Sequence, residues 1–291
     1  MKVTVVGGGS TYTPELVDGF ARLRGTLPID ELWLVDPDPE RLRLIAGVSR
    51  RMWARAGHPG TISATDDVVA GVADADVVLL QLRVGGQAAR HGDETFPHEA
   101  GLIGQETTGP GGFAKALRTV PVVLDIAETV RRHAKPDAWI IDFTNPVGIV
   151  TRALLEAGHR AVGLCNVAIG FQRRFARMLG VEPDAVALGH VGLNHLTWER
   201  AVTVRTPAGE QDVLPRLLAT RLAELEDEVH LPGSLLSLQE AVPSYYLRYF
   251  YAHDLVLQEQ LGAPTRAEAV QDVERRLLDH YSDETVDTKP A

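Results

Sequence analysis

The sequence predicts an α/β protein built on a doubly wound parallel sheet, followed by a second α+β domain. Over the first two-thirds of the chain, short apolar runs alternate with helical patterns, as in βαβ units. The first apolar run leads directly into a glycine turn at residues 7–9, and the second ends in an acidic residue, Asp36. Near residue 190 this rhythm changes to a longer, alternating strand. These features indicate that the first domain is Rossmann-like.

Four apolar runs predict the parallel strands of the first domain. Helices cover both faces of a parallel sheet, so each strand reads as a nearly continuous apolar run. The runs are Val3–Val6, Leu32–Val35, Val77–Leu82 and Ala138–Phe143.

Helix-start signals follow these strands. Thr13 is expected to be the N-cap of the first helix, with Pro14 at the first helical position, where no amide donor is missed. Asp38 is expected to cap the next helix, whose apolar stripe faces the core. A long helix is predicted from about residue 113 to residue 133, with Pro121 inside it.

The rest of the chain predicts a mixed α+β domain. Leu196–Val204 alternates as a strand does, and charged helical sequence follows it. The segment Ser244–Gln260 is aromatic and then amphipathic, and the residues from 282 onward are polar. We therefore predict a first domain over residues 1–190 and a substrate domain over residues 191–291.

The composition bounds the class of protein. Of the 291 residues, 45% are hydrophobic and 23% are charged, as in an ordinary globular protein. The formal net charge of −10 argues against nucleic acid and anionic membranes as partners, because no basic field is available to bind them. The single cysteine, the absence of a signal-peptide pattern and the absence of an apolar stretch of roughly 18 residues predict a cytoplasmic protein.

The glycine turn predicts a dinucleotide site. It follows a strand and precedes a helix, so Gly7 allows the tight turn and Gly9 lets a pyrophosphate approach the helix N-terminus. Tyr12 replaces the third glycine of the usual pattern. Asp36 lies where a carboxylate accepts the adenosine ribose hydroxyls, which favours NAD over NADP. The alternative is that Asp36 only caps the turn before Pro37.

Two other segments lie where α/β proteins bind ligands. The segment 104–112 is dense in glycine and contains Glu106, and such a loop presents backbone amides to a ligand. The alternative is a flexible linker. Asn145 follows the last predicted strand at its carboxyl end, where it could hydrogen-bond a sugar hydroxyl or the cofactor. Alternatively, Asn145 and Pro146 only end the strand.

The only cysteine and one histidine suggest a catalytic metal. Cys165 and His195 each lie beside an asparagine and near a strand end, and a thiolate with an imidazole can hold a divalent cation. Two protein ligands are too few for a structural zinc site, but they suit an open catalytic ion. The alternatives are an inert core thiol and a satisfied core histidine.

An aromatic cluster lies near the end of the chain. Helical spacing puts Tyr246, Tyr249 and Phe250 on one face, for which packing is the plain explanation. A tyrosine beside a cation and an arginine could also act as a base. Arg83 and Arg248 could pair with a phosphate, and surface exposure is the alternative for each.

Seven stretches, spread in order over nearly the whole chain, resemble the NAD-dependent glycosidases of glycoside hydrolase family 4, most of all its 6-phospho-β-glucosidases. The Cys-Asn pair at residues 165–166 is typical of that branch, whereas Cys-Asp marks the 6-phospho-α branch. The matching stretches are residues 7–14, 83–86, 104–112, 144–146, 165–167, 192–195 and 246–249.

The resemblance implies hydrolysis of 6-phospho-β-glucosides, such as phosphorylated disaccharides or aryl phosphoglucosides. This family is an exception to the two-carboxylate mechanism of glycosidases. NAD takes hydride from C3 of the sugar, and a divalent ion, typically Mn²⁺, stabilises the enediolate that forms when the C2 proton leaves. The C1 group is then eliminated, water adds and the hydride returns. Cys165 and His195 match the metal ligands, and Tyr246 matches the catalytic base.

The same resemblance assigns the remaining candidate residues. Cofactor contacts are expected at Gly7, Gly9, Ser10, Thr11, Asp36 and Asn145. Substrate contacts are expected at Arg83, Glu106, Asn145, Asn166, Asn194 and Arg248. The family also implies a homo-oligomer, either a dimer or a tetramer.

Two alternatives to this function are open. An NAD-dependent dehydrogenase of a small hydroxy acid would need a histidine base near an arginine and no metal. Family members usually continue well beyond the residue that matches Ala291, so the substrate domain is expected to be shortened at its C-terminus. An inactive NAD-binding module is therefore the second alternative.

Overall fold

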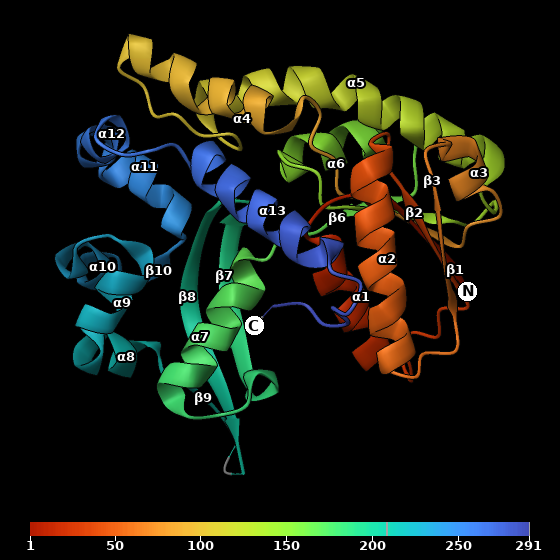
Figure 1. Ribbon diagram of the computed structural model, residues 1–291. Helices are drawn as coiled ribbons and strands as arrows, with labels where there is room; N and C mark the ends of the chain where they lie inside the picture. Colours follow the sequence, from red (N-terminus) through yellow and green to blue (C-terminus); the bar gives the residue numbers. More distant parts are fainter. Residues whose placement is uncertain (208, 291) are drawn as a thin grey trace. The chain divides into compact units, whose positions relative to one another are not determined.

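The computed structural model describes residues 1–207 and 209–290, which form two compact units (Figure 1). The first unit contains the chain up to Leu164 and the segment that begins at Pro264, and the second unit runs from Cys165 to Ala263. This division differs from the predicted boundary at residue 190. The reason is that the helix after Cys165 packs against antiparallel strands of the second unit rather than on the parallel sheet.

A six-stranded parallel sheet forms the centre of the first unit, in the order β3-β2-β1-β4-β5-β6. This is the predicted doubly wound arrangement. The four predicted strands are confirmed to within two residues at each end, whereas β3 and β6 were not predicted. Strand β3 is rich in hydroxyl residues and β6 has only three residues, so neither reads as a long apolar run. The strands are β1 (Lys2–Val6), β2 (Glu31–Val35), β3 (Thr61–Thr65), β4 (Val77–Leu80), β5 (Trp139–Asp142) and β6 (Ala161–Gly163).

Helices connect the strands of this sheet, and one further helix, α13 (Arg266–Ser282), follows the second unit in the chain. The connecting helices are α1 (Thr13–Arg22), α2 (Pro39–Arg55), α3 (Val68–Val72), α4 (Gly86–Thr95), η1 (Phe96–Ala100), α5 (Gly109–His133) and α6 (Val147–Glu156). Asp38 caps α2 as predicted, because its side chain accepts from the backbone N–H groups of Glu40 and Arg41. Among the described residues, no helix is both long and apolar enough to cross a lipid bilayer.

Two predicted helix starts are wrong in detail. The residue before α1 is Tyr12, and Thr13 lies inside the helix, where its Oγ1 accepts from Nε2 of Gln81 at 2.8 Å. The hydroxyl is therefore used to join the helix to the end of β4 rather than to cap it. Helix α5 begins at Gly109, so the last glycines of the 104–112 segment are helical.

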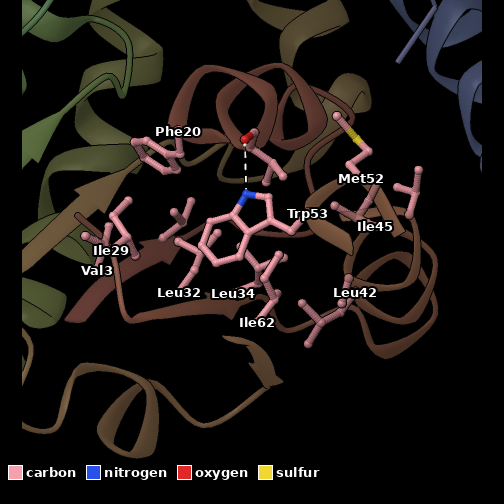
Figure 2. Close-up of a cluster of buried hydrophobic side chains, with 14 of the residues drawn as sticks. Val3, Phe20, Ile29, Leu32, Leu34, Leu42, Ile45, Met52, Trp53 and Ile62 are labelled. Carbon is pink, nitrogen blue, oxygen red and sulfur yellow. Dashed lines mark hydrogen bonds between the residues drawn. The ribbon is translucent and has the colours of Figure 1, made fainter. Parts of the chain in front are cut away.

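One hydrophobic cluster between the sheet and helices α1 and α2 anchors the N-terminal half of the first unit (Figure 2). Trp53 lies at its centre, and its indole N–H donates to the carbonyl of Val17 at 3.2 Å, so the only polar atom of the ring is paired. Tyr281 of α13 is buried in the same cluster. A core residue therefore lies directly before the polar residues that start at position 282. Fully burying a large apolar side chain contributes roughly 1.5–3 kcal/mol to stability.

The second unit is built on a small antiparallel sheet. The predicted strand Leu196–Val204 is confirmed as β8 (Leu196–Thr206), which pairs with β7 (Val186–Leu193), β10 (Val242–Pro243) and β9 (Gly209–Asp212). The helices are α7 (Val167–Leu179), η2 (Pro183–Ala185), α8 (Leu214–Thr220), α9 (Leu222–Val229), α10 (Gly233–Gln239), η3 (Tyr245–Leu247), α11 (Arg248–Tyr251) and α12 (His253–Leu261). Phe171 and Phe175 of α7 pack with the buried valines of the sheet to form the core of this unit.

Candidate active site

Cys165 and His195 lie together in the second unit, although 29 residues separate them in the sequence. The Sγ atom of Cys165 lies 3.5 Å from Nε2 of His195. Cys165 immediately precedes Asn166, the residue that begins α7, while His195 lies in the turn between β7 and β8. The predicted pairing of thiol and imidazole is therefore present in the folded chain.

The β7–β8 hairpin gives His195 its position. His195 has a left-handed backbone, with φ of 66°, which lets the turn close over only two residues. Gly192 has φ of 124°, and a Cβ atom there would lie 2.1 Å from the carbonyl oxygen of Leu196. Further along the hairpin, Glu199 is fully buried, and its Oε1 lies 2.6 Å from Nδ1 of His190 directly opposite. Glycine and this cross-strand pair thus hold the hairpin that carries the imidazole.

The imidazole of His195 is neutral near pH 7. Burial lowers its pKa to about 4, because the low-dielectric surroundings disfavour the charged ring. A neutral imidazole keeps a lone pair for a metal ion, whereas an imidazolium would repel one. Among the described residues, no group of three or more His, Cys, Asp and Glu side chains converges on one point. A thiol and a neutral imidazole are the donor types that suit a divalent cation whose other ligands would come from substrate and water.

Tyr246 lies flat on the ring of His195. The ring centroids are 3.7 Å apart and the planes differ by 4°. Tyr246 belongs to the short turn η3, which Ser244 caps by accepting from the backbone N–H of Tyr246. The backbone N–H of Ser244 in turn donates to the carbonyl of Thr197 on β8 at 2.8 Å. The predicted base and the predicted metal ligand are thus neighbours.

The remaining aromatic residues do not form the single face that helical spacing predicts. The segment is a 3-10 turn followed by the four-residue helix α11, so its side chains do not follow one helical period. Tyr249 contacts Tyr246 edge-on, with centroids 6.0 Å apart, but Phe250 is 77% exposed. The predicted grouping of Phe250 with the two tyrosines is wrong.

In the first unit, the glycine turn is held by Asp36. The backbone N–H groups of Gly7 and Gly8 donate to the carbonyl of Val35, and that of Gly9 donates to Oδ2 of Asp36 at 2.9 Å. A Cβ atom on Gly9 would lie 2.8 Å from Cγ of Asp36. In the structure, Gly9 therefore makes room for a carboxylate of the protein itself, whereas the sequence suggested that it makes room for a pyrophosphate.

The other predicted cofactor residues lie in or beside this turn. The backbone N–H of Ser10 donates to the carbonyl of Gly7 at 3.1 Å, which closes the turn, and Thr11 is half-buried next to it. Oδ1 of Asp36 accepts from the backbone N–H of Asp38 at 3.1 Å. Asp36 thus caps the following turn, as the alternative reading held, and it also braces the glycine turn.

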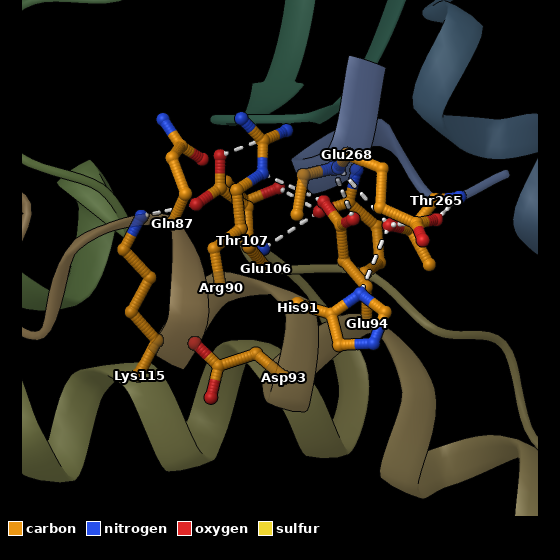
Figure 3. Close-up of polar contacts among 12 residues, drawn as sticks. Gln87, Arg90, His91, Asp93, Glu94, Glu106, Thr107, Lys115, Thr265 and Glu268 are labelled. Atoms are coloured by element: carbon orange, nitrogen blue, oxygen red, sulfur yellow. Dashed lines mark hydrogen bonds and ion pairs between the residues drawn. The ribbon is translucent and has the colours of Figure 1, made fainter. Parts of the chain in front are cut away.

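A buried cluster of charges surrounds Glu106 (Figure 3). The carboxylate pairs with Arg83 at 2.5 Å and with Lys115 at 2.5 Å through Oε2, and with Arg90 at 3.3 Å through Oε1. Arg90 also pairs with Glu94 at 2.7 Å. Lys115 is only 2% exposed. The segment around Glu106 is therefore tied to α4 and α5, so the flexible-linker alternative is wrong.

The three cations fix the ionisation of Glu106. Burial alone would raise the pKa of this carboxyl, but Lys115, Arg83 and Arg90 outweigh it and bring the pKa to about 2. Burial lowers the pKa of Lys115 to about 8, against the attraction of Glu106. Sequence reasoning found Arg83 and Glu106 but missed Arg90 and Lys115. The sequence feature that could have indicated them is their position on the helices that flank the glycine-rich segment. Charged side chains on such helices normally face solvent, so this feature is weak.

Asn145 lies in a loop that a buried carboxyl organises. Asp142, fully buried at the end of β5, accepts from the backbone N–H of Thr144 at 2.9 Å and from Oγ1 of Thr151 at 3.3 Å. Oγ1 of Thr144 accepts from the backbone N–H of Leu82 at 3.0 Å. The loop that carries Asn145 is thereby joined to the residue before Arg83, so two predicted substrate residues share one support.

The last three predicted substrate residues lie in the second unit. Asn166 and Asn194 are exposed and adjacent in sequence to Cys165 and His195. Arg248 is 9% exposed and already has partners in the protein, the hydroxyl of Tyr245 and the carboxylate of Glu259.

Models of two parts of one family match this chain. The family 4 glycosyl hydrolase model matches residues 2–181, and the model of the family 4 glycosyl hydrolase C-terminal domain matches residues 190–290. The chain therefore belongs to glycosyl hydrolase family 4, as the sequence motifs suggested.

Individual relatives of the chain carry more specific names. It is 40% identical to a probable 6-phospho-beta-glucosidase of Bacillus subtilis and 36% identical to the 6-phospho-beta-glucosidase of Escherichia coli. Each match covers 100% of this chain, and 68% and 67% of the respective relative. The structure of the 6-phospho-beta glucosidase from Thermotoga maritima with manganese, NAD+ and glucose-6-phosphate matches with a TM-score of 0.89 and 33% identity. That match covers 100% of this chain and 69% of the Thermotoga chain.

Proposed function

We propose that this chain hydrolyses 6-phospho-β-glucosides with the help of NAD and a divalent cation such as Mn²⁺. The observation that carries the proposal is the 3.5 Å approach of Cys165 Sγ to His195 Nε2, with Tyr246 stacked on that histidine. The relatives named 6-phospho-beta-glucosidase, and the Thermotoga structure with manganese, NAD+ and glucose-6-phosphate, support the choice of substrate and cofactors.

The residues that would hold the two cofactors lie in different units. The residues proposed to contact NAD lie in or beside the turn before α1, whose N-terminus suits a pyrophosphate: Gly7, Gly9, Ser10, Thr11 and Asp36. Cys165 and His195 offer a thiol and a neutral imidazole, which suit Mn²⁺ or another divalent cation.

NAD bound at the first set of residues would supply reversible hydride transfer at C3 of the sugar, and a cation held by Cys165 and His195 would supply Lewis-acid stabilisation. Tyr246 would accept the proton of C2 as its phenolate, because its ring is stacked on that of His195, beside Cys165. Five side chains are proposed to bind the phosphosugar: Asn145, Arg83, Glu106, Asn166 and Asn194.

The proposed substrate residues suit the phosphate and the hydroxyl groups of a phosphosugar. Arg83 is the most exposed cation of the charge cluster, with a side chain 32% exposed, and a guanidinium suits a phosphate. Asn145, Asn166 and Asn194 have amides that can both donate to and accept from sugar hydroxyls.

The deciding experiment follows hydrogen at C2. The chain is incubated in D₂O with NAD, Mn²⁺, a reductant and p-nitrophenyl 6-phospho-β-glucoside, with the 6-phospho-beta-glucosidase of Escherichia coli as a positive control. We expect release of nitrophenol, deuterium at C2 of the released sugar, and no net NADH. Cleavage without deuterium at C2 would indicate direct displacement.

The two alternatives give different results in the same assay. Net NADH formation from a small hydroxy acid, without need of Mn²⁺, would identify a dehydrogenase. NAD binding without any cleavage, while the control enzyme cleaves, would identify a nonenzymatic NAD-binding module.

A cytoplasmic location and a homo-oligomer, dimer or tetramer, belong to the same proposal. A single cysteine suits a reducing compartment. Light scattering of the purified chain measures the oligomeric state directly, and a monomer at working concentration would contradict this part of the proposal.

A further inference from the structure

Arg248 is a buried cation whose partners belong to its own unit. It is 9% exposed, and its guanidinium donates to the hydroxyl of Tyr245 at 3.1 Å and to Oε2 of Glu259 on α12 at 2.5 Å. The guanidinium carbon also lies 5.4 Å from the centroid of the Tyr245 ring. One residue thus joins η3, α11 and α12.

Ring contacts of Tyr245 connect Arg248 to the proposed base, Tyr246. Its ring meets the ring of Tyr246 edge-on, with centroids 6.1 Å apart and planes 84° apart, and meets Tyr249 in the same way at 6.2 Å. The ring of Tyr245 also meets the ring of His230 edge-on, with centroids 5.5 Å apart. Tyr246 then stacks on His195, and His195 faces Cys165. A continuous series of contacts therefore runs from Glu259 to the proposed metal ligands.

Tyr246 needs such a restraint, because its own backbone gives little. The 3-10 turn η3 has three residues, and the bond from the backbone N–H of Tyr246 to Oγ of Ser244 is long, at 3.4 Å. A turn of this length has no helical ladder of its own that could fix a side chain. Packing and hydrogen bonds from outside the turn must do so instead.

We propose that Arg248 and Tyr245 are positioning residues that hold the Tyr246–His195 stack in place, and that Arg248 does not bind the substrate phosphate. The inference rests on the proposed function for its kinetic measurements, but its metal-binding measurement does not depend on activity. The competing role, a direct contact to phosphate, would use the N–H groups of Arg248 that do not face Tyr245 or Glu259; one of these is Nε, which is buried and has no hydrogen-bond partner among the described residues.

The two roles predict different behaviour of three variants. Arg248→Met removes the charge, Arg248→Lys keeps it, and Tyr245→Phe removes only the hydroxyl that accepts from Arg248. Arg216→Met, an exposed arginine on α8 of the same unit, is the matched control. For each we would measure kcat and KM with p-nitrophenyl 6-phospho-β-glucoside, and Mn²⁺ affinity from the free-ion signal in electron paramagnetic resonance.

For positioning residues, we expect kcat and Mn²⁺ affinity to fall by about 10–100-fold in Arg248→Met, with little change in KM, because loss of a supporting partner misplaces the groups it orients. Tyr245→Phe should move the same quantities in the same direction by a smaller factor. Arg248→Lys should restore part of the loss, and Arg216→Met should behave as the parent chain.

A rise in KM with unchanged kcat and Mn²⁺ affinity in Arg248→Met, together with normal behaviour of Tyr245→Phe, would overturn the proposal in favour of a phosphate contact. If Arg248→Met does not fold, as judged by circular dichroism, Tyr245→Phe decides the question alone. If the parent chain cleaves no phosphoglucoside, the proposed function fails, but Mn²⁺ affinities of the four variants still test the positioning role.

Discussion

The rings of His195 and Tyr246 lie parallel in the structure, with centroids 3.7 Å apart and planes 4° apart. His195 is carried by a hairpin turn and Tyr246 by a 3-10 turn, and 50 residues of chain separate the two. The contact fixes the direction of both side chains relative to Cys165, which faces Nε2 of the same imidazole. The proposed base and the proposed metal ligands are therefore in direct contact with one another.

Replacing Cys165 with serine should weaken Mn²⁺ binding by at least about 100-fold, since changes even to the supporting shell of a metal site cost 10–100-fold. A hydroxyl is a much poorer ligand than a thiolate at neutral pH. Electron paramagnetic resonance of free Mn²⁺ measures the effect. Tyr246→Phe is the control: it keeps both ligands and the stacked ring, so it should bind Mn²⁺ normally while losing deuterium exchange at C2. Equal Mn²⁺ affinity in Cys165→Ser and the parent chain would exclude the thiol as a ligand.

Glu106→Gln should destabilise the protein by about 3–5 kcal/mol, because it leaves buried cations without their carboxylate. Lys115, at 2% exposure, is the cation most affected. Urea unfolding gives the free energy of unfolding. Glu156→Gln removes the exposed pair with Arg152 and should change this free energy by no more than about 0.5 kcal/mol. Similar values for the two variants would contradict the structural role of the cluster.

The same cluster predicts a dependence on acid. The pKa of Glu106 is about 2 in the folded chain, below its ordinary value of 4.5. The folded state therefore binds fewer protons than the unfolded state between these pH values, and stability falls as the pH falls. The difference in unfolding free energy between the parent chain and Glu106→Gln should be complete above pH 4.5 and shrink towards pH 2. A constant difference over this range would contradict the lowered pKa.

Asp142→Asn should stabilise the protein at neutral pH. Burial raises the pKa of Asp142 to about 6 from 3.8, so the folded state binds more protons than the unfolded state between these values. The stability contributed by this group is present below pH 3.8 and lost as the pH rises through 6. Since one pKa unit corresponds to about 1.4 kcal/mol, we expect a gain of about 1–3 kcal/mol at pH 7.5 and none at pH 4.

The choice of asparagine isolates the ionisation of Asp142 from its hydrogen bonds. The amide oxygen of asparagine can still accept from the backbone N–H of Thr144, whereas Asp142→Ala removes the acceptor. The alanine variant should therefore be less stable than the parent chain at both pH values. An asparagine variant that is destabilised at pH 7.5 would show that Asp142 is needed as an anion.

Gly9→Ala should weaken NAD binding and cost about 1–3 kcal/mol of stability, because the new methyl group would lie 2.8 Å from Cγ of Asp36. Asp36→Ala removes that atom, so the two changes together should cost less than their sum. Gly92→Ala in α4 is the control, since no atom lies within 4 Å of its added Cβ. Calorimetry with NAD and thermal unfolding measure both effects. Strictly additive losses would show that Gly9 is needed for another reason.

Four strands of the first unit were predictable because a strand buried on both faces is apolar along its local sequence. Strand β1 is buried along nearly its whole length, and its sequence is correspondingly apolar. Strand β3 lies at the edge of the sheet and carries threonine and serine, so its local pattern is too weak to predict a strand. Pairing with β2 supplies what the local sequence lacks.

The buried charge cluster around Glu106 could not be predicted from local sequence patterns. Arg90 and Lys115 read as ordinary surface charges on helices, and only the folded chain turns them towards Glu106. Charged side chains are almost never buried unless they are paired. The pairing here joins α4 and α5 to the segment between them, a relation that no periodicity expresses.

The sequence by itself determined the parallel sheet, the glycine turn followed by an acidic strand end, and the membership in glycosyl hydrolase family 4, because each leaves its mark in neighbouring residues or in motifs with fixed spacing. Only the tertiary structure decided that Cys165 meets His195, that Tyr246 lies on that imidazole, and that Arg248 is occupied by Tyr245 and Glu259. These contacts join segments tied together by strand pairing and packing, and the energy of such long-range contacts is not encoded in any short stretch of chain.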